Sequence, residues 1–126
     1  MRWTLRLWTS LAAISGFIAV AAGAFAAHGV ADPTAKELLR TGSNYELAHA
    51  LATLACAALA PAMPRARLAP ALFLGGSALF SGSLYALALG APRLVGAITP
   101  FGGLAFLAGW AVLAWAAATA PSHAGA

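Results

Sequence analysis

The chain carries very little charge. Only 8% of its 126 residues are Asp, Glu, Lys or Arg, whereas 62% are hydrophobic. A soluble domain of this size buries too little surface to hide so many apolar side chains. The scarcity of charge therefore argues against an ordinary soluble domain and predicts that the protein is embedded in lipid.

Acidic residues and cysteine are scarcer still. The three acidic residues, Asp32, Glu37 and Glu46, offer little acid–base chemistry, so we expect neither an enzyme nor a bound cofactor. The single cysteine, Cys56, excludes an intrachain disulfide. The formal net charge is +4, but the basic residues lie at the ends of apolar runs and not on one face, so a nucleic-acid partner is also not expected.

Most of the chain consists of four long uncharged runs. They cover residues 7–31, 47–64, 68–92 and 94–126. A helix of about 20 apolar residues crosses roughly 30 Å of hydrocarbon, so each run can host one crossing. We predict an all-α protein with one membrane domain, residues 1–126, folded as an antiparallel four-helix transmembrane bundle. The expected spans are 7–27, 44–62, 70–90 and 100–119. A cleavable signal peptide is the weaker interpretation of the first run, which is longer than an h-region of about 7 to 15 residues.

The connector after the first span contains residues typical of helix starts and ends. Asp32 can cap a short helix that begins at Pro33 and ends at Gly42, and we expect this helix to lie on the membrane surface. The residues from Ser43 to Glu46 resemble a capping box, which would start the second span near residue 44.

Small residues recur at three- and four-residue spacings within the spans. Such faces allow helix backbones to approach closely in lipid. We predict packing roles for six glycines and expect a homo-oligomer or a larger membrane complex. The six are Gly16, Gly23, Gly75, Gly82, Gly102 and Gly109.

Polar side chains near the ends of the spans form the candidate site. Antiparallel crossings would bring them to one membrane face, where polar groups are costly and often functional. The set is His28, Tyr45, Glu46, His49, Ser81, Ser83, Tyr85 and Thr99. His28, Glu46 and His49 are the only plausible metal ligands, but we expect no metal site, because carboxylate–histidine metal motifs in bundles need more acidic residues. Ser77, Ser81 and Tyr85 form a hydroxyl stripe that could line a solute path, although we expect no charged residue in the central half of any span.

The distribution of basic residues favours cytoplasmic termini. Arg2, Arg6, Arg65 and Arg67 would then lie inside, against three basic residues, Lys36, Arg40 and Arg93, outside.

Four motifs in order resemble a known family. They are Gly23-Ala-Phe-Ala-Ala-His-Gly29, Tyr45-Glu-Leu-Ala-His-Ala-Leu51, Phe80-Ser-Gly-Ser-Leu-Tyr85, and Ile98-Thr-Pro-Phe-Gly-Gly103 followed by Gly109-Trp110. The chain is similar over nearly its whole length to the YgdD family of small bacterial inner-membrane proteins, whose eukaryotic relatives include transmembrane protein 256. The resemblance implies four helices in the inner membrane and no established activity. It also implies recurrent residues at eight positions: His28, Tyr45, His49, Ser81, Ser83, Tyr85, Thr99 and Pro100. Ala26 and Glu46 stand where it implies glycine and glutamine.

These observations favour a structural or accessory membrane protein that acts by helix packing. The alternative is a small transporter or channel for a small or lipid-like solute.

Overall fold

The computed structural model describes residues 4–122, and it is helical. Four long helices account for most of the chain, and two short 3₁₀ helices precede the third and the fourth. They are α1 (Leu5–His28), α2 (Pro33–Leu59), η1 (Pro64–Leu68), α3 (Ala69–Ala88), η2 (Arg93–Ala97) and α4 (Thr99–Ala118). The all-α prediction is therefore confirmed, whereas the two 3₁₀ helices were not anticipated.

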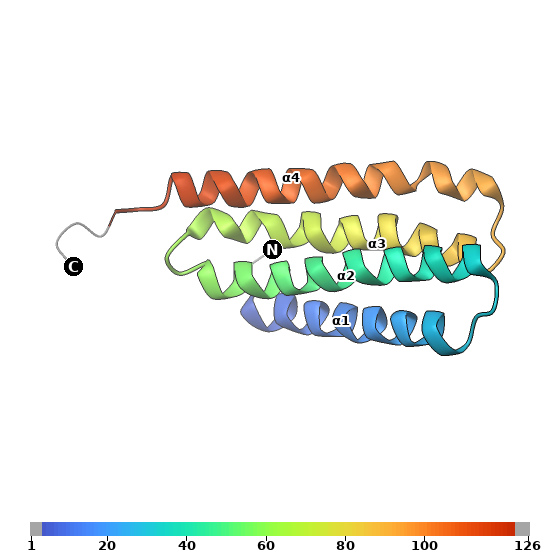
Figure 1. Ribbon diagram of the computed structural model, residues 1–126. Coiled ribbons are helices and arrows are strands. Elements are labelled where there is room, and N and C mark those ends of the chain that lie inside the picture. Colours follow the sequence, from blue (N-terminus) through green and yellow to red (C-terminus); the bar gives the residue numbers. More distant parts are fainter. Residues whose placement is uncertain (1–3, 123–126) are drawn as a thin grey trace.

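The long helices lie side by side in chain order (Figure 1). α1 packs against α2, α2 against α3, and α3 against α4, while α1 and α4 occupy opposite edges. Each helix runs back along the one before it, so α1 and α3 point the same way (Figure 1). The arrangement is an open layer of helices, and α2 and α3 form its middle.

Three segments are long and apolar enough to cross a membrane: Leu5–His28, Pro64–Ala88 and Arg93–Ala118. These correspond to the predicted spans 7–27, 70–90 and 100–119. α2 is not among them, because its first half carries charged and polar side chains.

The second helix differs from the prediction. A separate surface helix ending at Gly42 and a new span beginning near residue 44 were expected, but Pro33–Leu59 is one continuous helix of 27 residues. The capping-box prediction is wrong because Ser43 and Glu46 bond to other helices. The Ser43 hydroxyl donates to the Ala19 carbonyl at 2.6 Å, which ties the middle of α2 to α1.

Some helix ends, but not all, lie where the capping residues of the sequence predict them. The Asp32 carboxylate accepts a bond from the Ala35 amide at 2.8 Å, and Pro33 starts α2, as predicted. Thr99 is the first residue of α4, and its hydroxyl bonds to the Ser83 hydroxyl at 2.6 Å. Gly90 has a φ of +99°, which lets the chain turn immediately after α3.

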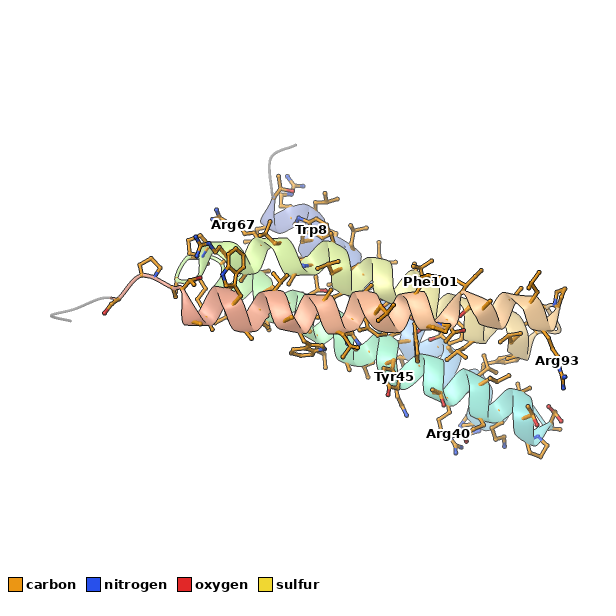
Figure 2. The ribbon with its side chains drawn as sticks, turned by 90° about the horizontal axis from the view of Figure 1, so that it is seen from above. Trp8, Arg40, Tyr45, Arg67, Arg93 and Phe101 are labelled. Carbon is orange, nitrogen blue, oxygen red and sulfur yellow. The ribbon has the colours of Figure 1, made fainter. Side chains whose placement is uncertain are left out.

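Charged side chains lie towards the two ends of the layer. Figure 2 shows Arg67 near one end and Arg40 and Arg93 near the other, with Trp8 on the same side as Arg67. Arg2, which contributes to the predicted orientation, lies outside the described residues. Glu46 is the exception to the pattern because it is the central residue of α2. In the predicted span 44–62 this residue stands near the start, whereas in the continuous helix α2 it stands in the middle.

Candidate functional site

The Glu46 carboxyl group is buried between three helices. Its Oε2 accepts a hydrogen bond from the Ser15 hydroxyl of α1 at 2.8 Å, and its Oε1 accepts one from the Tyr85 hydroxyl of α3, also at 2.8 Å. Only 7% of the Glu46 surface is exposed. No arginine, lysine or histidine within residues 4–122 forms an ion pair with this carboxyl group. Two neutral hydroxyl donors are therefore its only polar partners in the described chain.

A groove of about 350 Å³ lies between α1 and α3, and Glu46 is one of the residues that line it. Aliphatic side chains form its walls, and the lining residues with polar side chains are Ser15, Glu46, Ser77 and Tyr85. The Ser77 hydroxyl is buried and has no hydrogen-bond partner among residues 4–122. A polar atom buried without a partner is unfavourable, and such atoms are uncommon in folded proteins. The groove thus combines an apolar wall with an acid and an unsatisfied hydroxyl.

His49 forms a separate cluster on the side of α2 that meets α4. Its Nδ1 lies 2.6 Å from the Tyr45 carbonyl, and its Nε2 accepts a bond from the Trp110 indole N–H at 3.0 Å. A carbonyl only accepts and an indole N–H only donates, so the ring is neutral with its hydrogen on Nδ1. The ring stacks on Phe106 with centroids 3.6 Å apart. Both ring nitrogens are occupied, and the arrangement is that of a packed structural histidine.

A second hollow, of about 580 Å³, lies beside this cluster between α2 and α4. Tyr45, His49, Phe80, Phe106 and Trp110 are its aromatic lining. The two His49 nitrogens are already paired, so this hollow presents mainly ring faces and aliphatic surface. A ligand in this hollow would contact mainly apolar surface and would find few free hydrogen-bonding groups.

The remaining predicted site residues are distributed over several places. Ser81 donates to the Gly42 carbonyl at 2.7 Å and so ties α3 to α2. Ser83 and Thr99 bond to each other across α3 and α4. His28 is exposed as the last residue of α1, and its side chain makes no hydrogen bond within the described chain. The single polar cluster that the sequence suggested is therefore four separate contacts and one exposed histidine.

The three candidate metal ligands do not converge. Glu46 bonds towards α1 and α3, His49 towards α4, and His28 lies at the end of α1. Within residues 4–122, no group of three His, Cys, Asp or Glu side chains gathers closely enough to hold a metal ion.

The glycines divide into packed and open positions. A Cβ on Gly102 would collide with the Phe80 backbone, one on Gly109 would lie 2.6 Å from the Phe73 ring, and one on Gly23 would lie 2.9 Å from the Ser43 hydroxyl. These three glycines permit close helix approach, as the spacing indicated. At the other three positions an added Cβ would meet nothing within 4 Å in the described chain, so their predicted packing role finds no partner within one chain: Gly16, Gly75 and Gly82.

Several residues that build these contacts were missed from the sequence. Ser15 lies on the small-residue face of α1 with Ala12 and Ala19, so its spacing could have revealed it. Gly42 was interpreted as a helix end, but it receives the Tyr85 ring, whose nearest atom would be 2.6 Å from an added Cβ. Phe106 had no signal beyond its apolar character.

Comparison with known proteins identifies relatives of similar length. Residues 22–103 match the family described as "Protein of unknown function (DUF423)". The chain is 46% identical over 112 residues to a UPF0382 membrane protein of Haemophilus influenzae, covering 86% of this chain and 90% of that protein. It is 47% identical over 119 residues to the UPF0382 inner membrane protein YgdD of Escherichia coli K12, with 87% and 88% covered.

More distant relatives extend the comparison. The UPF0382 membrane protein YwdK of Bacillus subtilis is 37% identical over 119 residues, covering 90% of this chain and 97% of that protein. No solved structure matches the chain. The identities, the coverage and the apolar helices agree with the resemblance found in the motifs, and the chain belongs to the DUF423 family of UPF0382 membrane proteins.

Proposed function

We propose that this protein is a structural or accessory component of the membrane that packs its helices against a second copy or a larger complex. One observation carries the proposal. An added Cβ at Gly16 or at Gly75 would meet nothing within 4 Å in the described chain, so the small-residue faces at these two positions remain available for close approach by another helix.

The same proposal includes four crossings as an antiparallel transmembrane bundle. α1 and α3 run in the same direction, and both are apolar enough to span the bilayer. The chain must return between them, and α2 is the only element that can carry it back. At about 1.5 Å per residue, the 27 residues of α2 exceed the roughly 30 Å hydrocarbon thickness.

We further propose that the protein lies in a bacterial inner membrane with both termini in the cytoplasm. The basic residues Arg6, Arg65 and Arg67 support this orientation, because positive charge accumulates on the cytoplasmic side of short loops. An even number of crossings places both termini on the same side.

Quantitative co-purification tests the accessory role. A tagged chain is extracted from native membranes in mild detergent, and its size and partners are measured by mass spectrometry against an untagged control. We expect a stoichiometric partner or a homo-oligomer, and we expect Gly16→Leu to disrupt it. Phe17→Leu is the matched control, since Phe17 is already large and 78% exposed. A monomer without partners, or assembly unaffected by Gly16→Leu, contradicts the proposal.

A second candidate function is transport of a small or lipid-like solute. The observation that favours it is the groove between α1 and α3 with its unpartnered Ser77 hydroxyl. Flux into liposomes is the measurement, and flux unchanged by Ser77→Ala and Tyr85→Phe would rule this candidate out.

A further inference from the structure

We propose that the groove between α1 and α3 binds a hydrophobic organic ammonium ion, whose N–H groups bond to the Glu46 carboxylate and the Ser77 hydroxyl. The proposal names a ligand class for the second candidate function, but it concerns binding alone. It does not depend on the accessory role.

Charge complementarity is the first step. Glu46 lies at the centre of α2 and is 7% exposed, yet no cationic side chain within residues 4–122 faces it. A buried carboxylate normally requires a cationic partner because hydroxyl donors offset only part of its desolvation. Each of its oxygens accepts one hydroxyl here and retains further lone pairs. An ammonium ion supplies both the missing charge and additional donors.

The Ser77 hydroxyl is the second, independent step. A serine in a membrane helix usually bonds to its own backbone or to a neighbouring helix. Ser77 is 4% exposed and lines the groove, and its hydroxyl has no partner of either kind in the described part of the chain. A protonated primary amine has three N–H donors, so one ligand group can bond to both Glu46 and Ser77.

The walls of the groove determine the rest of the ligand. Leu11, Ile14, Ile18 and Leu74 surround the polar groups, and the volume of about 350 Å³ suits a compact apolar body. Leu11, Ile14 and Ile18 are exposed on the surface of the layer. The groove is therefore open to the surrounding medium along α1, and a hydrophobic amine would enter from the lipid.

The test compares two molecules that differ only in the polar group. The protein is placed in nanodiscs, and binding of radiolabelled 1-aminoadamantane, protonated at neutral pH, is measured by equilibrium dialysis beside neutral 1-adamantanol, with empty nanodiscs subtracted. We expect saturable binding of the amine at one per chain, at least roughly tenfold tighter than the alcohol. Glu46→Gln should weaken it by roughly tenfold or more. Glu37→Gln, on the exposed start of α2, should leave it unchanged. Equal binding of the two molecules, or binding retained in Glu46→Gln, overturns the proposal.

Filling the groove provides a test that does not alter charge. Gly82 lines the groove and Gly75 does not, yet both are α3 glycines at which an added Cβ meets nothing within 4 Å. Gly82→Leu should abolish amine binding, whereas Gly75→Leu should preserve it. Binding retained in Gly82→Leu overturns the site.

Disulfide cross-linking tests whether a second copy occupies the groove. Quantitative disulfide formation between chains that carry both Ala78→Cys and Cys56→Ala would show a second copy there and would also overturn the proposal. Flux is not measured here, so failed transport and failed binding remain distinguishable.

Discussion

At the scale of single residues, glycine positions decide how closely the helices approach. Gly102 and Gly75 lie on neighbouring helices, but only Gly102 faces the backbone of another helix. The sequence placed both on small-residue faces, because spacing along a helix shows that a face exists. It does not reveal which partner covers that face. This is why three of the six predicted packing glycines meet no neighbour.

We therefore expect opposite effects from the same substitution at these two positions. Gly102→Ala places a methyl group against the Phe80 backbone and should lower the free energy of unfolding by about 1 to 3 kcal/mol. Gly75→Ala meets open space and should raise it by up to about 1 kcal/mol through better helix propensity. Reversible unfolding in mixed micelles, followed by circular dichroism, measures both. Equal changes in the two variants would contradict the packing described for Gly102.

His49 provides a second prediction at this scale. The bonds to the Tyr45 carbonyl and the Trp110 indole require a neutral ring with hydrogen on Nδ1. Nitrogen NMR of the labelled imidazole should show this tautomer. Trp110→Phe should change the Nε2 signal and lower the free energy of unfolding by about 0.6 to 1.7 kcal/mol. Trp115→Phe, at the far end of α4, should leave the imidazole signals in place, and an Nε2-protonated ring in the wild type would exclude the described arrangement.

At the scale of elements, the ends of α1, α3 and α4 could be predicted and the course of α2 could not. Apolar runs bounded by charge, proline and glycine define the ends of α1, α3 and α4 within a few residues. In α2, Ser43 and Glu46 are typical of a helix start, but they bond to Ala19, Ser15 and Tyr85. Local sequence cannot distinguish a capping side chain from one that bonds across helices. The candidate site was split for the same reason, because its side chains bond to three different neighbours.

Hydrogen exchange tests the continuity of α2. Amides from Gly42 to Glu46 lie inside a continuous helix, so we expect protection comparable to that of the following turns. The short connector at residues 30–31 should exchange fast in the same experiment. Rapid exchange at residues 42–46 would support a helix break and the capping box in its place.

At the scale of the whole molecule, the layer has two ends that carry different basic residues. Arg67 and Arg93 lie at opposite ends (Figure 2), so they belong on opposite sides of the membrane if the long helices cross it. The sequence predicted this separation because both residues flank apolar runs. It did not predict the open order of the helices, which depends on which faces meet.

Cysteine labelling tests that arrangement in intact cells. In a Cys56→Ala background, Arg93→Cys should react with a membrane-impermeant maleimide added outside, and Arg67→Cys should react only after permeabilisation. The reverse pattern would place the termini outside. Labelling of both positions from one side would contradict an odd number of crossings between them.

The burial of Glu46 between α1 and α3 has a consequence for how the protein enters the membrane during synthesis. α2 is the long helix that falls short of the hydropathy of a spanning segment, and its polar side chains are shielded only by its neighbours. Left alone in lipid, it would expose a carboxyl group and unpaired hydroxyls to hydrocarbon. α2 is thus a poor candidate for one-at-a-time release from the insertion machinery. If α2 crosses the membrane as proposed, it would have to be held beside α1 until α3 can join them, which would make biogenesis of this small protein a concerted event among its first three helices.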